Sequence, residues 1–522
     1  MDGNRPRLFR AILAGVFSLS VLACSGEELQ ESWGHDYEEF EMRAQLDARE
    51  MVINHEGFRS SSCGFIPCPV TVAGNVLTLM ASCGTYSSLL IPDGYTLDGA
   101  GNAVIAIDAP GGHFVGPVVR NCGASAFYRN LRIMTVGLSN ACDAGDDALA
   151  GIRFDDASGS VLNTQIFNIR QGDGTSGCQE GVGIVVRNQV PLSPTRIVAI
   201  ENNVLLGYQK AGIMAVGNVD VNITGNRVMG AGPVDDIAQI GIQLGLGATG
   251  TIMANDISGH SYTGAGVANG ILVYGGALYG GPLSMNVSIR DNYLINNDIG
   301  VYLSQGNADG SPPGVRTNIE VIENIIENGA VTNGYVYQAG ISDLGTGNVI
   351  HSNEITGLGY DPATLPGSTF AVDVVAGPAV SLAFLTPPQQ VTVGACSGPV
   401  VVQSQDVNGN LSIPLLTSFN ITPVGDAAPG IQFFTDASCA GPAVTTLDLS
   451  NPQAASRFYF RAVTPGNVTL IVWNFMMFQF QAEQVITSLV AGETSGLPVT
   501  LAPLRADVQP RTVTPSGQVW GP

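Results

Sequence analysis

A short motif that recurs about every 30 residues is the feature that most constrains how this chain can fold. The motif is a glycine followed by isoleucine or valine and then by more residues of strand type. Its glycines are Gly151, Gly183, Gly212, Gly241, Gly270, Gly300 and Gly340. A fixed period of this length is typical of a solenoid, in which each repeat forms one coil and neighbouring coils share a continuous core.

A second marker, asparagine followed two residues later by an apolar residue, alternates with the first. It includes Asn202, Asn226, Asn255, Asn292, Asn324 and Asn353. Segments such as Val219–Ile223 and Met285–Ile289 alternate with period two, which predicts strands. Frequent Gly and Asn leave little room for helices. We therefore expect coils of short strands, with Asn226, Asn255 and Asn292 stacked as a ladder at one corner.

The composition agrees with an all-β protein. Charged residues make up 12% of the chain and hydrophobic ones 45%, while Gly contributes 66 and Pro 29 of its 522 residues. The net charge of −22 excludes nucleic-acid binding, which requires a basic surface to neutralise phosphates. Lys210 is the only lysine.

The two alternating markers resemble the right-handed parallel β-helix of the pectate-lyase-like superfamily, over roughly residues 70 to 360. Ile91–Gly99 is similar to an opening coil of that superfamily. The resemblance implies a parallel β-helix, and it implies that polysaccharide would bind along the outer face of one stacked sheet. We expect the stretch from Cys63 to Cys83 to cap the N-terminal end, because an open end exposes strand edges.

The first residues have the pattern of an export signal. Arginines at positions 5, 7 and 10 precede a short apolar run that ends at Cys24, and this end resembles a bacterial lipobox. We expect residues 1–24 to be a lipoprotein-type signal peptide with Cys24 lipidated, and residues 25–60 to be an acidic tether. The alternative is ordinary cleavage near Ala23. In both cases we expect the protein to be exported. It is either a lipoprotein of the outer membrane or cell surface, which contacts the membrane only through its lipid, or a secreted protein.

An even number of cysteines remains once Cys24 is set aside, which favours disulfides in an exported chain. Cys396 and Cys439 stand alone in the C-terminal third, so we expect them to pair. The pairing of the other six stays open among Cys63, Cys68, Cys83, Cys122, Cys142 and Cys178. The spacing predicts no metal site and no cofactor, although acidic loops leave Ca²⁺ open.

The period is lost from about residue 365. We assign residues 61–364 to the capped β-helix, 365–490 to a β-sandwich and 491–522 to a Pro-rich tail. The sandwich region resembles the immunoglobulin-like modules of bacterial surface proteins. We expect the whole protein to be a monomer.

The outer face of the sheet that contains the Gly-Ile strands can be indexed from strand alternation. If the residue after each glycine points inward, the next one points outward, and so does every second residue from there. This indexing places Arg187, Gln243, Tyr274 and Tyr302 on the outer face. It also places there the residues that stand two positions before a motif glycine, which include Lys210 and Gln239. Amides and tyrosines suit hydroxyl recognition and sugar stacking, so the substrate-binding candidates are Arg187, Gln239, Gln243, Tyr274 and Tyr302.

Two residues are candidates for catalysis. Lys210 could remove a proton next to a uronate carboxylate, and Asp236 lies nearby in the sequence. An ordinary surface lysine is the competing interpretation. The arginine motif of pectate lyases and the histidine and Arg-x-Lys motifs of polygalacturonase-type hydrolases are absent. Two functions therefore stay open: an exported polysaccharide lyase, glycoside hydrolase or polysaccharide-binding protein, and a non-catalytic surface or adhesive scaffold.

Overall fold

A computed structural model describes residues 58–60, 63–172, 177–188, 193–374, 377–407, 409–451, 453–474 and 477–490. The predicted signal peptide with Cys24, nearly all of the acidic tether and the Pro-rich tail lie outside the described residues. In the described part of the chain, no helix has the length and apolar character needed to cross a membrane. Strands dominate, and the helical elements found there are the short 3₁₀ helices η1 (Gly145–Asp147), η2 (Ala277–Tyr279) and η3 (Ala428–Gly430).

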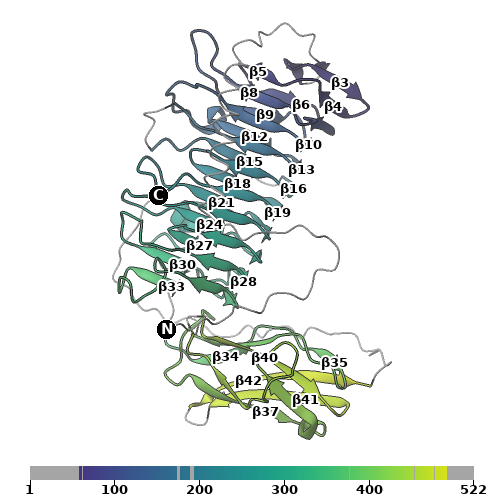
Figure 1. Cartoon of the computed structure of the whole chain (residues 1–522), viewed down its shortest axis with the longest axis vertical. Helices are drawn as coiled ribbons and strands as arrows, with labels where there is room; N and C mark the ends of the chain where they lie inside the picture. Colours follow the sequence, from purple (N-terminus) through teal and green to yellow (C-terminus); the bar gives the residue numbers. More distant parts are fainter. Residues whose placement is uncertain are drawn as a thin grey trace, which may run out of the picture. The chain divides into compact units, whose positions relative to one another are not determined.

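Three long sheets stack coil upon coil, as Figure 1 shows, and each coil contributes one strand to each sheet. Sheet 1 contains β3 (Val70–Ala73), β4 (Val76–Leu79), β7 (Tyr95–Asp98), β10 (Ser125–Arg129), β13 (Ser158–Leu162), β16 (Arg196–Glu201), β19 (Val219–Thr224), β22 (Thr249–Met253), β25 (Val287–Arg290), β28 (Glu320–Ile322) and β31 (Val349–His351). Sheet 2 contains β5 (Cys83–Thr85), β8 (Ala103–Ala106), β11 (Arg132–Thr135), β14 (Gln165–Phe167), β17 (Val204–Leu206), β20 (Arg227–Met229), β23 (Asp256–Ser258), β26 (Tyr293–Ile295), β29 (Ile325–Glu327) and β32 (Glu354–Thr356).

Sheet 3 is formed by the Gly-Ile strands. It contains β6 (Leu89–Ile91), β9 (Pro117–Asn121), β12 (Ala150–Asp155), β15 (Val182–Asn188), β18 (Ala211–Gly217), β21 (Ile240–Gly245), β24 (Asn269–Gly275), β27 (Ile299–Gln305), β30 (Gln338–Asp343) and β33 (Thr369–Val374). All pairings in these sheets are parallel except the β3–β4 hairpin, so the predicted parallel β-helix is confirmed. Because β33 pairs with β30, sheet 3 extends past the predicted boundary at residue 364.

The core is an apolar column built from one residue per strand. The register of sheet 3 aligns Ile184 with Ile213, Ile242 and Ile271, and all four side chains are fully buried. The predicted stacking of these isoleucines is confirmed. Each inward row continues over many coils, so the burial of apolar surface that stabilises the fold is spread along the whole solenoid.

An asparagine ladder runs along one corner of the coils. Asn226 donates its backbone N–H and its side-chain amide to Oδ1 of Asn255, at 2.9 and 3.0 Å, and Asn255 makes the same two contacts to Asn292. The ladder continues through Asn324 to Asn353, and the predicted corner is confirmed. Each buried amide satisfies backbone groups that a tight turn leaves without a partner.

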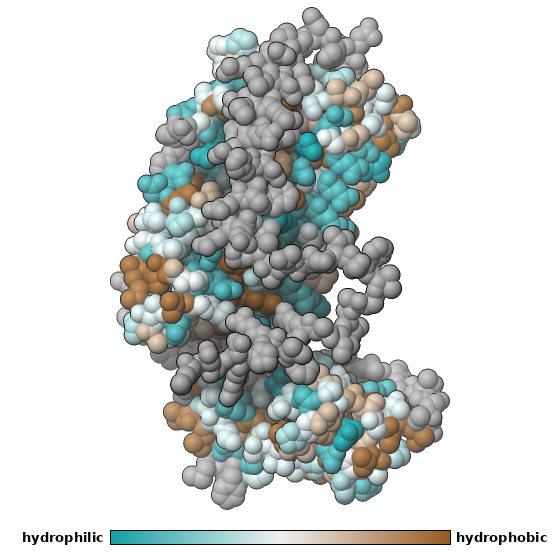
Figure 2. All heavy atoms as spheres, in the orientation of Figure 1, coloured by the Kyte–Doolittle hydropathy of each residue, from teal (hydrophilic) through white to brown (hydrophobic). Residues whose placement is uncertain are grey.

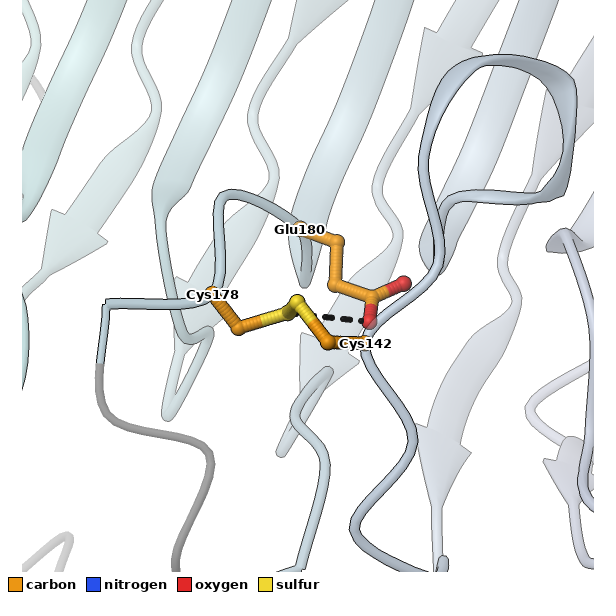
Figure 3. Close-up of side chains that lie close together, drawn as sticks. All are labelled: Cys142, Cys178 and Glu180. Atoms are coloured by element: carbon orange, nitrogen blue, oxygen red, sulfur yellow. Dashed lines mark hydrogen bonds between the residues drawn. A yellow bond between two sulfur atoms is a disulfide. The ribbon is translucent and has the colours of Figure 1, made fainter.

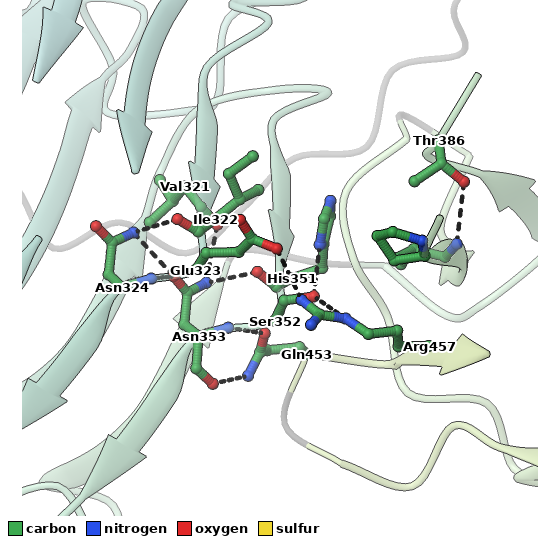
Figure 4. Close-up of polar contacts among 12 residues, drawn as sticks. Val321, Ile322, Glu323, Asn324, His351, Ser352, Asn353, Thr386, Gln453 and Arg457 are labelled. Carbon is green, nitrogen blue, oxygen red and sulfur yellow. Dashed lines mark hydrogen bonds and ion pairs between the residues drawn. The ribbon is translucent and has the colours of Figure 1, made fainter. Parts of the chain in front are cut away.

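The C-terminal region supplies hydrogen-bond partners for the last asparagine of the ladder. Asn353 N–H donates to Oε1 of Gln453, and the Gln453 amide donates back to the Asn353 carbonyl, as Figure 4 shows. Arg457 contacts Ser352 and Glu323 beside this pair. Gln453 thus takes the position that the asparagine of a further coil would occupy.

The C-terminal region forms a β-sandwich with its own apolar core. One sheet contains β34 (Ser381–Phe384), β36 (Val400–Gln405), β40 (Ala455–Ala462) and β38 (Ile431–Phe434). The other contains β35 (Gln390–Thr392), β42 (Met477–Leu489), β41 (Gly466–Asn474), β37 (Ser418–Val424) and β39 (Thr446–Asp448). The sandwich is as predicted, and its immunoglobulin-like character stays a prediction.

Four disulfides link the eight described cysteines. Cys396 bonds Cys439, as predicted. The pairs that the sequence left open are Cys63–Cys122, Cys68–Cys83 and Cys142–Cys178. The first two hold the N-terminal segment, including the β1 (Phe58–Ser60) and β2 (Gly64–Ile66) hairpin, against the first coils.

Candidate functional site

The outer face of sheet 1 is an ordinary solvated surface. In β19 the outward residues Asp220 and Asn222 are exposed between buried valines and isoleucine. Figure 2 shows hydrophilic residues over the part of the molecule where Figure 1 places β10 to β19. The outer face of sheet 3 differs, because arginines, tyrosines and apolar side chains form distinct groups along it.

One continuous row runs across the outer face of sheet 3, and it matches the indexing from the sequence. In register order it contains Leu90, Arg120, Arg153, Val185, Met214, Gln243, Leu272, Tyr302, Ser342 and Asp373. A second row lies two residues further along the strands and contains Asp155, Arg187, Val216, Gly245, Tyr274 and Ser304. The first row carries Arg120 and Arg153 near its start and Tyr302, Ser342 and Asp373 at its end. The second row starts with Asp155 and Arg187 and finishes with Tyr274 and Ser304.

We call the group at the C-terminal end of these rows the tyrosine cluster. It consists of Gln243, Tyr274, Tyr279, Tyr302, Ser304, Tyr337, Ser342 and Asp373. The predicted residues Gln243, Tyr274 and Tyr302 all belong to it. The four tyrosines are all half-buried, so each ring keeps part of its surface in contact with solvent.

Short contacts hold the tyrosine cluster together. The rings of Tyr274 and Tyr279 meet edge to face at 5.1 Å, and the Tyr279 hydroxyl lies 2.6 Å from Ser304 Oγ. Tyr337 donates its hydroxyl to Asp373 at 2.5 Å and lies 3.0 Å from Ser342 Oγ. Burial, and then the nearby Asp373 carboxylate, raise the pKa of Tyr337, which keeps its hydroxyl protonated as a donor.

Three residues of this cluster escaped the sequence indexing. Tyr279 and Tyr337 lie in connections, where strand alternation does not apply. Asp373 lies on β33, whose register aligns Val372 with Ile341, but Ala371 stands at the position of the motif glycine Gly340. A search that allowed alanine in place of the motif glycine would have found Asp373.

A second group, the arginine cluster, lies at the N-terminal end of the rows. It contains Arg120, Arg153, Arg187, Asp146 and Asp155. Arg187, a predicted site residue, is ion-paired with both Asp155 and Asp146. Arg120 was missed for the same reason as Asp373, because β9 has Val118 where the motif has glycine.

An apolar strip separates the two clusters. Val185, Met214 and Leu272 from the first row pack with the residues that directly precede the motif glycines, Ala150, Val182, Ala211 and Ile240. Strand pairing passes from Val182 to Ile184 and skips Gly183, so the inward and outward alternation shifts by one residue there. A β-carbon at Gly183 would lie 2.7 Å from the Leu205 side chain, inside the core.

This shift corrects the predicted outward positions of Lys210 and Gln239. Both precede their strands and turn into the corner instead of standing on the outer face. Gln239 is 3% exposed, and its amide binds the backbone of Ala231, Tyr208 and Gln209. Those bonds use the donors and acceptor that sugar recognition would need.

Lys210 is separate from the tyrosines. Its ammonium donates to the carbonyl of Ala238 at 3.0 Å, and it precedes β18, two strands before the β24 strand of Tyr274. Asp236 lies in the connection between β20 and β21, where its carboxylate accepts from the N–H of Ile237. The predicted set is thus divided among the tyrosine cluster, the arginine cluster and this corner.

Burial lowers the pKa of Lys210 to about 8. Because the unfolded value is about 10.4, the unfolded chain binds more protons between these values, and Lys210 makes the protein more stable as pH rises through that window. We expect reductive ¹³C-methylation to give a dimethyl-lysine signal that titrates near pH 8. The matched variant Lys210→Arg identifies the signal, since it removes the only lysine; a midpoint near 10.4 would contradict the burial seen here.

One further group combines two sulfurs and a carboxylate. Cys142, Cys178 and Glu180 come together, as Figure 3 shows. The two sulfurs are bonded to each other and therefore offer no thiolates to a metal. Glu180 is 1% exposed and accepts from the backbone N–H groups of Asp143 and Leu149, which fixes the loop that carries η1.

Comparison with known proteins agrees with this architecture. A family model described as "Right handed beta helix region" matches residues 150–355, so the solenoid is a right-handed parallel β-helix. No curated protein matches the chain. The prediction of a monomer stays a prediction.

Three solved structures are similar to this chain. The Dettilon tailspike protein gp208 is 13% identical over 74% of this chain and 87% of its own, with a TM-score of 0.35. The tailspike of E. coli bacteriophage HK620, solved with a pentasaccharide, is 9% identical over 76% and 71%, with a TM-score of 0.31. The periplasmic alginate epimerase AlgG is 10% identical over 55% and 79%, with a TM-score of 0.25.

Proposed function

We propose that this protein is an exported polysaccharide-binding protein and that the polymer lies along the outer face of sheet 3, with sugar rings on the tyrosine cluster. The observation that carries the proposal is the presence of Tyr274, Tyr279 and Tyr302 on adjoining coils, next to the hydroxyls of Ser304 and Ser342. Half-buried aromatic rings offer apolar faces to sugar C–H groups, while hydroxyls, an amide and a carboxylate bind sugar hydroxyls. The four disulfides support an oxidising, extracytoplasmic location.

The arrangement of the cluster favours binding over hydrolysis. Glycoside hydrolysis requires two carboxylates that face the same bond. Asp373 faces outward, but Asp343 on the neighbouring strand takes the inward register position of Leu303 and is buried among backbone N–H and amide donors. Asp373, moreover, already accepts from Tyr337.

Removing a tyrosine should weaken polysaccharide binding. We expect Tyr274→Ala and Tyr279→Ala each to lower affinity by about tenfold, the equivalent of about 1.4 kcal/mol, as for an aromatic residue at the centre of an interface. Affinity gel electrophoresis against a panel of soluble neutral and acidic polysaccharides measures this. Tyr293→Ala is the matched control, because Tyr293 is 41% exposed on sheet 2. Equal retardation of all three variants would place the polymer elsewhere.

A second candidate is a lyase that acts on an acidic polysaccharide, with Lys210 as the base. The observation that favours it is the burial of Lys210, which brings its pKa to about 8, close to the range a general base needs. Appearance of the unsaturated product, followed by its ultraviolet absorbance on uronate polymers, checks this. Lys210→Ala should then lower turnover by about 10² to 10⁴. Turnover that persists in the variant would exclude Lys210 as the base.

A further inference from the structure

Positive charge is concentrated in the arginine cluster of a chain whose net charge is −22. Arg120 and Arg153 are register partners on the neighbouring strands β9 and β12. Arg187 lies on the next strand, β15, where it pairs in register with Asp155. Two carboxylates, Asp146 and Asp155, accompany these three guanidinium groups. The cluster therefore has a formal charge of one plus, on a face where the rest of the protein would repel an anion.

The two carboxylates leave part of the guanidinium groups without partners. Asp155 binds Nε of Arg153 at 2.9 Å and Nε of Arg187, and Asp146 binds Nη2 of Arg187 at 2.5 Å. Arg153 also donates Nη1 to the Asp146 carbonyl. Its Nη2 and the Nε of Arg120 then have no hydrogen-bond partner, although both atoms are buried and Arg153 is 2% exposed. An unsatisfied buried donor on a charged group destabilises the protein, so a ligand that supplies an acceptor there is favoured.

The loop beside these arginines is held in place independently of them. The Cys142–Cys178 disulfide (Figure 3) and the two backbone N–H bonds to the Glu180 carboxylate fix the segment that leads into η1. Asp146, which belongs to η1, contacts Arg153 and Arg187 from this loop. A site whose side chains and neighbouring loop are already held in place loses little entropy when a ligand binds.

We propose that Arg120 and Arg153 form a binding site for one oxyanion group, the carboxylate or the sulfate of an acidic sugar. Guanidinium N–H donors can bind two oxygens of a carboxylate or of a sulfate group at once. An oxyanion would neutralise the excess charge and supply acceptors for the donors left unsatisfied. Only the statement that a polymer carries the anion rests on the proposed polysaccharide function; the oxyanion site itself does not.

The spacing of the two clusters fits a single extended polymer. β12 and β24 are four strands apart in sheet 3, so Arg153 and the strand of Tyr274 are about 19 Å apart at the usual strand spacing. An acidic polysaccharide along this face would place a charged group at the arginines and other sugar rings on the tyrosines. Binding would then depend on salt, because the charge pairs lie near the surface.

Small anions test the oxyanion site directly. We expect methyl glucuronide and inorganic sulfate to bind the full-length protein and compete with each other, while the neutral methyl glucoside does not bind. Ligand-detected NMR measures the affinities. Arg120→Gln should weaken anion binding by about tenfold or more. It leaves the carboxylate pairs of Arg153 and Arg187 in place. Arg129→Gln is the matched control, since Arg129 is 46% exposed and pairs with Asp98 on sheet 1.

The outcomes separate the two proposals. Binding of one anion class only, with loss in Arg120→Gln, supports the site and identifies its ligand as uronate or sulfate. Failure of both anions to bind, or equal binding by Arg120→Gln and the parent protein, overturns it. Tyr274→Ala should leave small-anion affinity unchanged while it weakens polymer binding. If small anions bind at Arg120 but no polysaccharide does, the proposed function is wrong and the oxyanion site stands.

Discussion

Replacing Asn255 with alanine is expected to lower the free energy of unfolding by about 4 kcal/mol. Asn255 is 1% exposed and lies in the middle of the asparagine ladder. Its loss leaves the backbone N–H of Asn226 without its acceptor and the Ile223 carbonyl without the Asn255 amide donor. Each unsatisfied buried group costs about 1–3 kcal/mol.

The midpoint of urea unfolding, followed by circular dichroism, measures this loss. Asn222→Ala is the matched control, because Asn222 is exposed on β19 and binds Glu201 at the surface. We expect the control to change stability by less than about 0.5 kcal/mol. Similar midpoints for the two variants would show that the ladder asparagines are replaceable, and the ladder would then be a consequence of the fold instead of a cause of its stability.

The substitution Gly212→Ala is expected to destabilise the protein by about 3 kcal/mol. A methyl group at this position would collide with Val228 Cγ1 and would lie 2.7 Å from the carbonyl oxygen of Gly241. The carbonyl belongs to β21 of the next coil, between Ile240 and Ile242, which both pair with β18, so it cannot move without disturbing the stack. Overpacking of a tight core usually costs about 1–3 kcal/mol, and a clash with backbone falls at the upper end.

Gly112→Ala provides the comparison for Gly212→Ala. A β-carbon at Gly112 would have no neighbour within 4 Å, and the glycine does not require a left-handed conformation. We expect its unfolding temperature to equal that of the parent protein or to rise slightly, because alanine restricts the unfolded chain more than glycine does. A Gly212→Ala variant as stable as Gly112→Ala would contradict the packing described for the motif glycines.

Much of the fold could be predicted because the signals were local and periodic. The stacked isoleucines, the asparagine corner and both outward rows of sheet 3 follow from residue spacing, since strand alternation has period two and every coil repeats it. The Cys396–Cys439 pair followed from the isolation of these cysteines in the sequence. Gln243, Tyr274 and Tyr302 were correctly placed on the same face for the same reason.

The errors arise where alternation is interrupted. The motif glycine turns toward the core together with the residue after it, so the phase shifts and Gln239 and Lys210 turn into the corner. A sequence does not show this shift, because it depends on the neighbouring coil, whose carbonyl and side chain leave no room for a β-carbon. Arg120 and Asp373 were missed because their strands have valine and alanine in place of the motif glycine.

The sequence by itself determined the repeat, and with it the parallel β-helix, because one apolar residue in every coil must lie on the next to be buried. Only the tertiary structure decided which chemical groups meet. Tyr279 and Tyr337 reach the outer face from connections, Asp146 reaches Arg187 from a loop fixed by Glu180, and Gln453 completes the ladder at Asn353 from the sandwich. These contacts join residues far apart in the sequence and outside the periodic strands. Their positions depend on how loops and ends close over the coils, which no local spacing encodes.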